Sequence, residues 1–214
     1  MKNIIAFDCD STLSAIEGVD ELARLAGDNI FQQVEDLTNQ AMDGRIAIEE
    51  VFGKRLDLIK PSQQQCHQVG LMYLKEIEPT AEKTISTLQE KGWECLIISG
   101  GFTPCIEALA RKLNINTIEA VPLHFSADGS YQGYEESYPT TRNGGKPEIL
   151  SHIKESKCPD KLVMVGDGVS DLETTPVVDH FIGFTRYAAR PQVTENCMYE
   201  ARELASVLDI LDLR

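Results

Sequence analysis

The sequence has no long hydrophobic segment, and no apolar run approaches the roughly 18 residues that suggest a membrane-spanning helix. Its N-terminus also lacks the basic flank and the long apolar stretch of a signal peptide. Internal repeats and low-complexity tracts are missing as well. We therefore expect a cytoplasmic protein without a membrane partner. A chain of 214 residues is long enough for one domain, or for one domain with a smaller insert.

Basic residues are in the minority, with 20 Lys and Arg against 34 Asp and Glu and a net charge of −14. A nucleic-acid partner needs a basic surface to neutralise its phosphates, so this balance argues against one. The same negative field would repel an anionic substrate. Any anion site in this protein must therefore carry its own local positive charge.

Cysteine pairs are also missing, because the six cysteines are dispersed and form no C-x-x-C motif. In a cytosolic chain this spacing predicts reduced, mostly buried thiols, and neither a disulfide framework nor a zinc site. The four histidines are equally dispersed, so their spacing indicates no Ser-His-Asp or Cys-His site.

The chain does have a short apolar run at its start, residues 4–7, followed directly by Asp8-Cys9-Asp10-Ser11-Thr12. Such a run is typical of a buried parallel strand, and α/β sheets place their chemistry just past the carboxyl ends of strands. In an extended backbone Asp8 and Asp10 would point the same way. Two like charges so close to a sheet core need a cation or a proton to neutralise one of them. The alternative interpretation of this segment is a polar turn after a strand.

From about residue 13 to residue 78 the apolar residues recur at helical spacing, and strand signals are missing. We predict four helices in this block, at 16–26, at 30–42 with an end at Asp43-Gly44, at 48–59, and at 62–74 with Ser62 as N-cap. We interpret residues 13–78 as a helical cap inserted after the first strand. Residues 1–12 and 79–214 would then form the catalytic core.

Strands and helices alternate over the rest of the chain. The predicted strands are 93–98, 120–125, 131–134, 161–165 and 180–184, and the predicted helices are 79–91, 103–113, 146–155 and 203–213. The turn Ala127-Asp128-Gly129-Ser130 marks a hairpin between the second and third of these strands. The alternation predicts an α/β fold with a doubly wound, Rossmann-like parallel sheet.

Two more of the predicted strands end in polar motifs, and a parallel sheet would bring those ends to the edge that carries Asp8. Ser99-Gly100-Gly101 offers a hydroxyl and bare backbone N–H groups ahead of a helix, which suits an anion. Asp167 and Asp171 add carboxylates, and clustered oxygen ligands suit Mg²⁺. Lys146 opens a helix after two glycines and could present its ammonium inward. Each motif taken alone is also compatible with an ordinary turn or a solvated lysine.

The order D-x-D-x-T, Ser-Gly-Gly, Lys and G-D-G-x-x-D resembles the four-motif signature of the haloacid dehalogenase superfamily phosphatases. Over essentially its whole length the chain is similar to the phosphoserine phosphatase family within that superfamily. The resemblance implies a Rossmann-like core with a helical cap. It also implies Mg²⁺-dependent hydrolysis of O-phospho-L-serine to L-serine and phosphate through an aspartyl-phosphate, as in L-serine biosynthesis.

The resemblance further implies roles for individual residues. Asp8 would be the nucleophile, Asp10 the general acid and base, and Lys146 a catalytic cation. Mg²⁺ would be held by Asp8, Asp167 and the backbone carbonyl of Asp10, with Asp171 in support. The implied substrate contacts are Glu17, Arg55, Ser99, Gly100, Lys146 and Ser170. Two positions depart from the family pattern, since Ile48 stands where an aromatic residue is usual and Ser170 where Asn or Thr is commoner.

The residue types fit this chemistry. A carboxylate is ionised at neutral pH, so as a nucleophile it needs no base to activate it. The phosphate needs nearby positive charge, and the leaving group needs a proton donor. Glu17 and Arg55 are opposite charges that suit the ammonium and the carboxylate of phosphoserine. The alternative is a phosphatase or phosphotransferase for another small phosphorylated metabolite, with homoserine as an acceptor, for example. A non-catalytic binding protein is less favoured, because the acidic motifs and Lys146 are intact. We expect a monomer or a homodimer.

Overall fold

The protein is built on a six-stranded sheet with strand order β3-β2-β1-β6-β7-β8, in which all neighbouring strands are parallel. The structure is a computed structural model and describes residues 2–42 and 48–213. The strands of this sheet are β1 Asn3–Phe7, β2 Trp93–Phe102, β3 Thr117–Val121, β6 Lys161–Gly166, β7 His180–Phe184 and β8 Tyr199–Ala201. The predicted α/β fold with a parallel sheet is confirmed.

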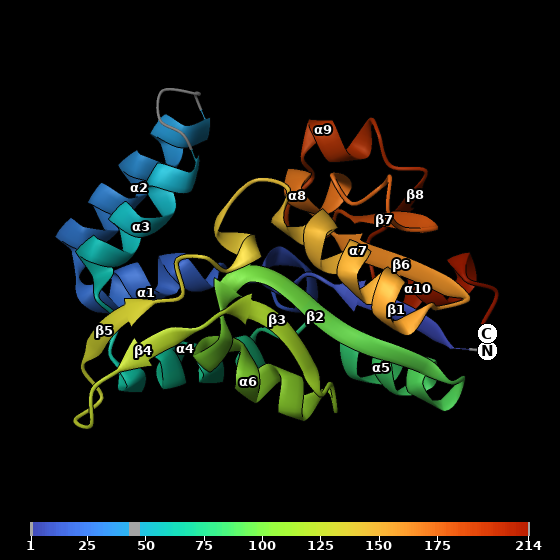
Figure 1. The fold of residues 1–214 in the computed structure, drawn as a ribbon, viewed down its shortest axis with the longest axis horizontal. Coiled ribbons are helices and arrows are strands. Elements are labelled where there is room, and N and C mark those ends of the chain that lie inside the picture. The colour runs from blue at the N-terminus through green and yellow to red at the C-terminus, as the bar shows by residue number, and fades with distance from the viewer. Residues whose placement is uncertain (1, 43–47, 214) are drawn as a thin grey trace.

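Helices cover both faces of the sheet (Figure 1). They are α1 Gly18–Ala26, α2 Asp28–Met42, α3 Ile48–Ile59, α4 Gln63–Lys75, α5 Ala81–Glu90, α6 Thr103–Lys112, α7 Gly145–Lys157, α8 Val169–Leu172, α9 Pro191–Thr194 and α10 Ala205–Ile210, with short helical turns η1 Cys9–Leu13 and η2 Pro139–Thr141. On β1, Ile5 and Phe7 pack with α5 and α6, whereas Ile4 and Ala6 pack on the opposite face with α7. Because both faces of β1 are covered, its residues form a continuous apolar run.

The four helices predicted between residues 13 and 78 are present as α1 to α4. The two ends of this segment lie side by side, since the Ala15 amide donates to the Glu76 carbonyl and the Glu78 amide to the Leu13 carbonyl, both at 2.9 Å. Helices α2 and α3 run next to each other away from the sheet (Figure 1). The predicted helix end at Asp43-Gly44 lies outside the described residues.

Helix α4 differs from α2 and α3 in its surroundings. It runs along α6, one of the helices that pack on the sheet, and Gly70 of α4 approaches the backbone of Cys105 in α6. A methyl group at Gly70 would lie 3.1 Å from that carbonyl oxygen. The inserted segment is therefore joined to the sheet layer by close packing as well as by its two chain ends.

The single strand predicted for residues 120–125 is wrong. Thr117–Val121 forms β3 at the edge of the main sheet, and Leu123–Phe125 forms β4, which pairs antiparallel with β5, Tyr131–Tyr134. The residue between them is Pro122, which has no N–H to donate and so interrupts the strand. The hairpin predicted around Asp128-Gly129 is present between β4 and β5.

Some element boundaries also differ from the prediction, and one strand was missed. β2 continues through Ser99-Gly100-Gly101 with a register shift before Phe102, and the C-terminal helix is shorter than predicted. β8 is a three-residue edge strand that the sequence analysis missed, because so short a run carries no clear alternation. None of the described helices is long and apolar enough to cross a membrane.

Candidate active site

The carboxyl ends of β1, β2 and β6 meet at one edge of the sheet, where a cavity of about 280 Å³ opens. Most of the residues singled out in the sequence line it. The lining residues are Asp8, Asp10, Glu17, Val19, Phe52, Arg55, Gly100, Gly101, Phe102, Lys146, Asp167, Gly168, Ser170 and Arg190. A parallel sheet places strand ends together in this way, although the contributing segments are far apart in sequence.

The turn after β1 brings Asp8 and Asp10 to this cavity. Asp8 has an extended backbone, and its Oδ1 accepts a hydrogen bond of 2.8 Å from the Cys9 amide. The chain then reverses through η1, where Ser11 has the left-handed value φ = 50°. Residues other than glycine seldom adopt that conformation, and such strain concentrates at functional sites.

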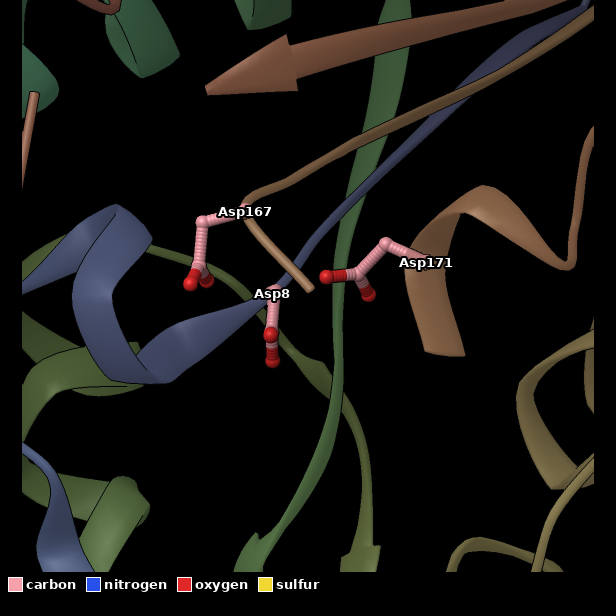
Figure 2. Close-up of side chains that lie close together, drawn as sticks. All are labelled: Asp8, Asp167 and Asp171. Carbon is pink, nitrogen blue, oxygen red and sulfur yellow. The ribbon is translucent and has the colours of Figure 1, made fainter. Parts of the chain in front are cut away.

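Three carboxylates lie close together, from Asp8, Asp167 and Asp171 (Figure 2). Asp8 and Asp167 line the cavity, and Asp171 is fully buried. Each contributes an oxygen, and these oxygens lie within 4.8 Å of one another. Burial, and then the charge of Asp8, raise the pKa of Asp167 to about 6 and that of Asp171 well above its usual range. Three buried carboxylates are stable side by side only if cations or protons neutralise them, and hard oxygen donors suit Mg²⁺.

Lys146 supplies one of those positive charges. Its Nζ donates hydrogen bonds to Asp8 Oδ1 at 2.9 Å and to Asp171 Oδ1 at 2.6 Å, and the residue is only 4% exposed. Burial alone would lower the pKa of Lys146, but Asp171 and Asp8 raise it above its usual value, so the side chain is an ammonium. Gly145 before it is required by space, since a Cβ there would lie 1.9 Å from the Pro139 carbonyl oxygen.

The Asp10 carboxylate is not part of the group formed by the other three. Its Oδ1 accepts hydrogen bonds from the Gly18 amide and from Tyr73 Oη, both at 2.6 Å, and its Oδ2 accepts a longer one of 3.4 Å from Ser99 Oγ. Burial, followed by the charge of Asp8, raises the pKa of Asp10 to about 6. A carboxyl group with such a pKa can exchange a proton near neutral pH.

Glu17 and Arg55 reach the cavity from the inserted segment. Ser11 Oγ donates to Glu17 Oε1 at 2.7 Å, while burial and the charge of Asp10 raise the pKa of Glu17 to about 8. Arg55 lies on α3, and its Nε is buried without a hydrogen-bond partner among the described residues. Burial lowers the pKa of Arg55, and the nearby charges of Asp20 and Glu17 oppose that effect.

The remaining predicted substrate contacts separate into two groups. Gly100 and Ser170 line the cavity, whereas Ser99 is fully buried behind it. Ser99 Oγ accepts a hydrogen bond of 2.9 Å from the Gly101 amide. In this structure Ser99 therefore holds the glycine backbone that faces the cavity.

Arg190 is a cavity residue that the sequence analysis missed. Its Nε donates to Asp167 Oδ2 at 3.1 Å, and its guanidinium lies 3.9 Å from Glu17 Oε1. Arg190 comes from the loop after β7, and β7 is the neighbour of β6 in the sheet. The predicted strand 180–184 was the one available signal, since the carboxyl end of a further parallel strand would lie at the same edge.

Comparison with known proteins identifies the family of the chain. The family model described as haloacid dehalogenase-like hydrolase matches residues 2–175. The chain is 36% identical to the phosphoserine phosphatase of Bos taurus over 210 residues, which are 97% of this chain and 92% of that protein. It is 32% identical to the phosphoserine phosphatase of Methanocaldococcus jannaschii over 211 residues, which are 97% of this chain and 96% of the other.

A solved structure is similar over the same extent. A substrate-bound phosphoserine phosphatase complex superposes with a TM-score of 0.82 at 28% identity, over 98% of each chain. Family motifs, relatives and fold thus agree with the resemblance found in the sequence. The chain belongs to the phosphoserine phosphatase family of the haloacid dehalogenase-like hydrolases.

Proposed function

We propose that this enzyme hydrolyses O-phospho-L-serine to L-serine and phosphate through a phosphoryl group carried on Asp8. The observation that carries the proposal is the position of the Asp8 carboxylate, which lines the cavity and accepts a hydrogen bond of 2.9 Å from Lys146 Nζ. An ionised carboxylate can attack phosphorus without a general base. The Lys146 ammonium offsets the repulsion between that carboxylate and the phosphate, and stabilises the charge on the equatorial oxygens.

The proposed cofactor is Mg²⁺, held by Asp8, Asp167 and the backbone carbonyl of Asp10, with Asp171 in support. The residues fit this ion, because three buried carboxylates lie together and supply hard oxygen ligands. Among the described residues, the cations that contact them are Lys146 and Arg190. When bound, Mg²⁺ supplies positive charge that polarises the phosphoryl oxygens.

Asp10 is the proposed general acid and base. Its raised pKa, about 6, means that the carboxyl group can both hold and accept a proton near neutral pH. In the first half of the reaction Asp10 donates a proton to the serine oxygen as the bond from that oxygen to phosphorus breaks. In the second half Asp10 accepts a proton from the water that attacks the aspartyl-phosphate.

Glu17 and Arg55 are the proposed specificity residues, for the ammonium and the carboxylate of the substrate. The support for Arg55 is its buried Nε, which has no partner among the described residues although Arg55 lines the cavity. A buried donor without an acceptor costs free energy, and a substrate carboxylate would satisfy it.

Residues 13–78 form the proposed cap, and residues 1–12 and 79–214 the proposed core. The adjacent ends of the inserted segment support this division, while the packing of α4 along α6 suggests that α2 and α3 form the outer part of the cap. Closure of such a cap would exclude water other than the attacking one from the phosphorylated enzyme.

The proposed setting is the cytoplasm, within L-serine biosynthesis and as a monomer or a homodimer. The six cysteines are free thiols, as is usual in a reducing compartment.

Phosphate release from a panel of phosphomonoesters tests the proposed substrate. L-phosphoserine, phosphothreonine, phosphoethanolamine and sugar phosphates would be compared at equal concentration with Mg²⁺. We expect the highest kcat/KM for L-phosphoserine. It carries both the ammonium and the carboxylate, which phosphoethanolamine and sugar phosphates do not, and it lacks the additional methyl group of phosphothreonine. A higher kcat/KM for another ester would assign the same chemistry to a different small metabolite.

A further inference from the structure

Tyr73 belongs to none of the motifs, yet it contacts the proposed acid. It lies on α4, is fully buried, and donates a hydrogen bond of 2.6 Å from its Oη to Asp10 Oδ1. The packing of α4 along α6 holds its ring. Its hydroxyl has a charged partner at short range, and hydrogen bonds to charged groups are among the strongest in proteins.

A second donor binds the same oxygen. The Gly18 amide donates to Asp10 Oδ1 at 2.6 Å, so that this oxygen is held from two sides. Gly18 also makes room for the tyrosine, because a Cβ at this position would lie 2.1 Å from Tyr73 Oη. The backbone at the start of α1 and the side chain from α4 therefore form one binding site for one carboxylate oxygen.

The other oxygen of Asp10 lies next to the Ser99-Gly100-Gly101 backbone, which forms part of the cavity wall. Asp10 Oδ2 is 3.4 Å from Ser99 Oγ, and it lies 3.1 Å from where a Cβ would stand on Gly101, a lining residue. A proton on Oδ1 would compete with two donors that already point at that oxygen, whereas Oδ2 is free of strong donors among the described residues. The two oxygens are therefore chemically different.

We propose that Tyr73 is a positioning residue, which together with the Gly18 amide fixes the Asp10 carboxyl group and leaves Oδ2 as the atom that transfers the proton. The inference rests on the proposed function of Asp10. The Oδ2 proton passes to the substrate oxygen as the bond from that oxygen to phosphorus breaks and the bond from Asp8 to phosphorus forms. Oδ2 later takes a proton from water as the water oxygen bonds to phosphorus and the Asp8 carboxylate leaves.

The leaving group distinguishes this role from simple packing. The serine alkoxide is strongly basic and needs a proton as it departs, whereas nitrophenolate is stable enough to leave without one. The quantity to compare is kcat/KM, because it covers the steps up to phosphorylation and excludes the later hydrolysis, which both substrates share. A Tyr73 that only packs would affect both substrates equally.

The test is Tyr73→Phe, which removes the hydroxyl and keeps the ring. We expect kcat/KM to fall roughly tenfold or more with L-phosphoserine and by less than about twofold with 4-nitrophenyl phosphate. Tyr138→Phe is the matched control, since the Tyr138 hydroxyl also donates to a carboxylate, Glu119, but away from Asp10. It should leave the ratio of the two kcat/KM values unchanged.

Gly18→Ala provides a second variant, because its new methyl group must displace the Tyr73 hydroxyl, and it should lower the same ratio. Circular dichroism and Tm would show whether each variant folds. If Tyr73→Phe does not fold, the ratio measured for Gly18→Ala tests the positioning role instead. Equal losses on the two substrates, or no loss, in the folded variant would overturn the inference.

Asp10→Asn separates this inference from the proposed function. It should itself show the loss that depends on the leaving group, and adding Tyr73→Phe to it should change kcat/KM little further. Without a selective loss in Asp10→Asn, the proposed role of Asp10 fails and this inference fails with it. A selective loss in Asp10→Asn without one in Tyr73→Phe overturns the positioning role alone.

Discussion

Single residues at the cavity are held by shared charges. The Lys146 ammonium serves two carboxylates, Asp8 and Asp171, and Arg190 bonds a third, Asp167. Removing one partner of a buried ion pair leaves an uncompensated charge and is strongly destabilising. Substitutions that keep the shape and hydrogen bonds of a side chain are therefore the informative ones here.

Asp8→Asn should abolish turnover while the protein still folds. The amide keeps an oxygen that can accept from Lys146 and Cys9, but it is a poor nucleophile. Phosphate release measures the loss, and acid quench with peptide mapping locates the phosphoryl group in the unmodified enzyme. Asp160→Asn, at an exposed carboxylate that accepts from the Lys2 amide, is the control and should remain active. A phosphoryl group found on Ser99 or Cys9 would refute the assignment of the nucleophile.

Arg55→Ala should impair phosphoserine hydrolysis more than phosphoethanolamine hydrolysis, because only phosphoserine carries a carboxylate. A charge-assisted contact contributes about 1.5–3 kcal/mol, so kcat/KM should fall selectively by roughly ten- to a hundredfold. Lys54→Ala, on the same helix but exposed and paired with Glu50, should leave the ratio of the two substrates unaltered. If Arg55 acted through cap closure instead, both substrates would suffer equally.

Among the elements, α3 and α4 connect the inserted segment to the sheet layer in different ways. Phe52 of α3 packs edge-on against Phe102 at the end of β2, with ring centroids 6.0 Å apart, and at a tilt against Tyr134 of the β4–β5 hairpin, with ring centroids 5.4 Å apart. Helix α4 instead lies along α6 and carries Tyr73 to Asp10. Its start is fixed by a capping box in which Ser62 and Gln65 bond each other's backbone amides.

Ser62→Ala should therefore destabilise the protein. Loss of an N-cap side chain typically costs about 1 kcal/mol in the free energy of unfolding, because a helix amide loses its acceptor. Ser156→Ala is the matched control, since Ser156 is an exposed residue inside α7 and caps no helix. Urea denaturation would measure the free energy of unfolding of both variants. Equal values for Ser62→Ala and the unmodified protein would argue against a stabilising role for the Ser62 N-cap.

The molecule as a whole is strongly acidic, with a net charge of −14, yet its cavity holds Lys146, Arg55 and Arg190. Local cations thus oppose the overall field at the place where an anion would bind. The cavity is also lined by buried carboxylates, so we expect the stability of the protein to depend on pH and on added Mg²⁺.

Metal-free protein should become less stable as pH rises from about 4 through 6. The pKa of Asp10 and that of Asp167 are both about 6, against an ordinary value of 3.8, so the folded state keeps protons that the unfolded state has lost. The contribution of these two carboxyl groups to the free energy of unfolding is fully present below the ordinary pKa of 3.8 and disappears as pH passes 6. Mg²⁺ would replace the proton on Asp167, so its effect on Tm should grow with pH.

We expect saturating Mg²⁺ to raise Tm by about 5 °C at pH 7.5 in chelator-treated protein, and by less at pH 5. Scanning calorimetry with and without Mg²⁺ would measure both shifts. Asp167→Asn should reduce the shift at pH 7.5, whereas Asp160→Asn should retain it. An undiminished shift in Asp167→Asn would place the ion elsewhere.

The sequence by itself determined much of this protein. Strand and helix periods depend on local residue patterns, so β1, the helices of the inserted segment and the alternation after them could be predicted. Motifs at three strand ends predicted that Asp8, Asp10, Ser99 and Asp167 lie together, because parallel strands end at a common edge. Lys146, which opens a helix, was assigned to this group by the resemblance to the family. The family followed from the order of those motifs.

Tertiary structure alone decided the rest, because contacts between distant segments leave no local pattern. It joined Arg190 to Asp167 across 23 residues and Tyr73 to Asp10 across 63. It also divided 120–125 between two sheets, and it left the Asp10 carboxylate outside the group formed by Asp8, Asp167 and Asp171. The hydrogen bonds to Asp10 Oδ1 also depend on tertiary structure, because packing brings the Gly18 amide of α1 and the Tyr73 hydroxyl of α4 to the same atom.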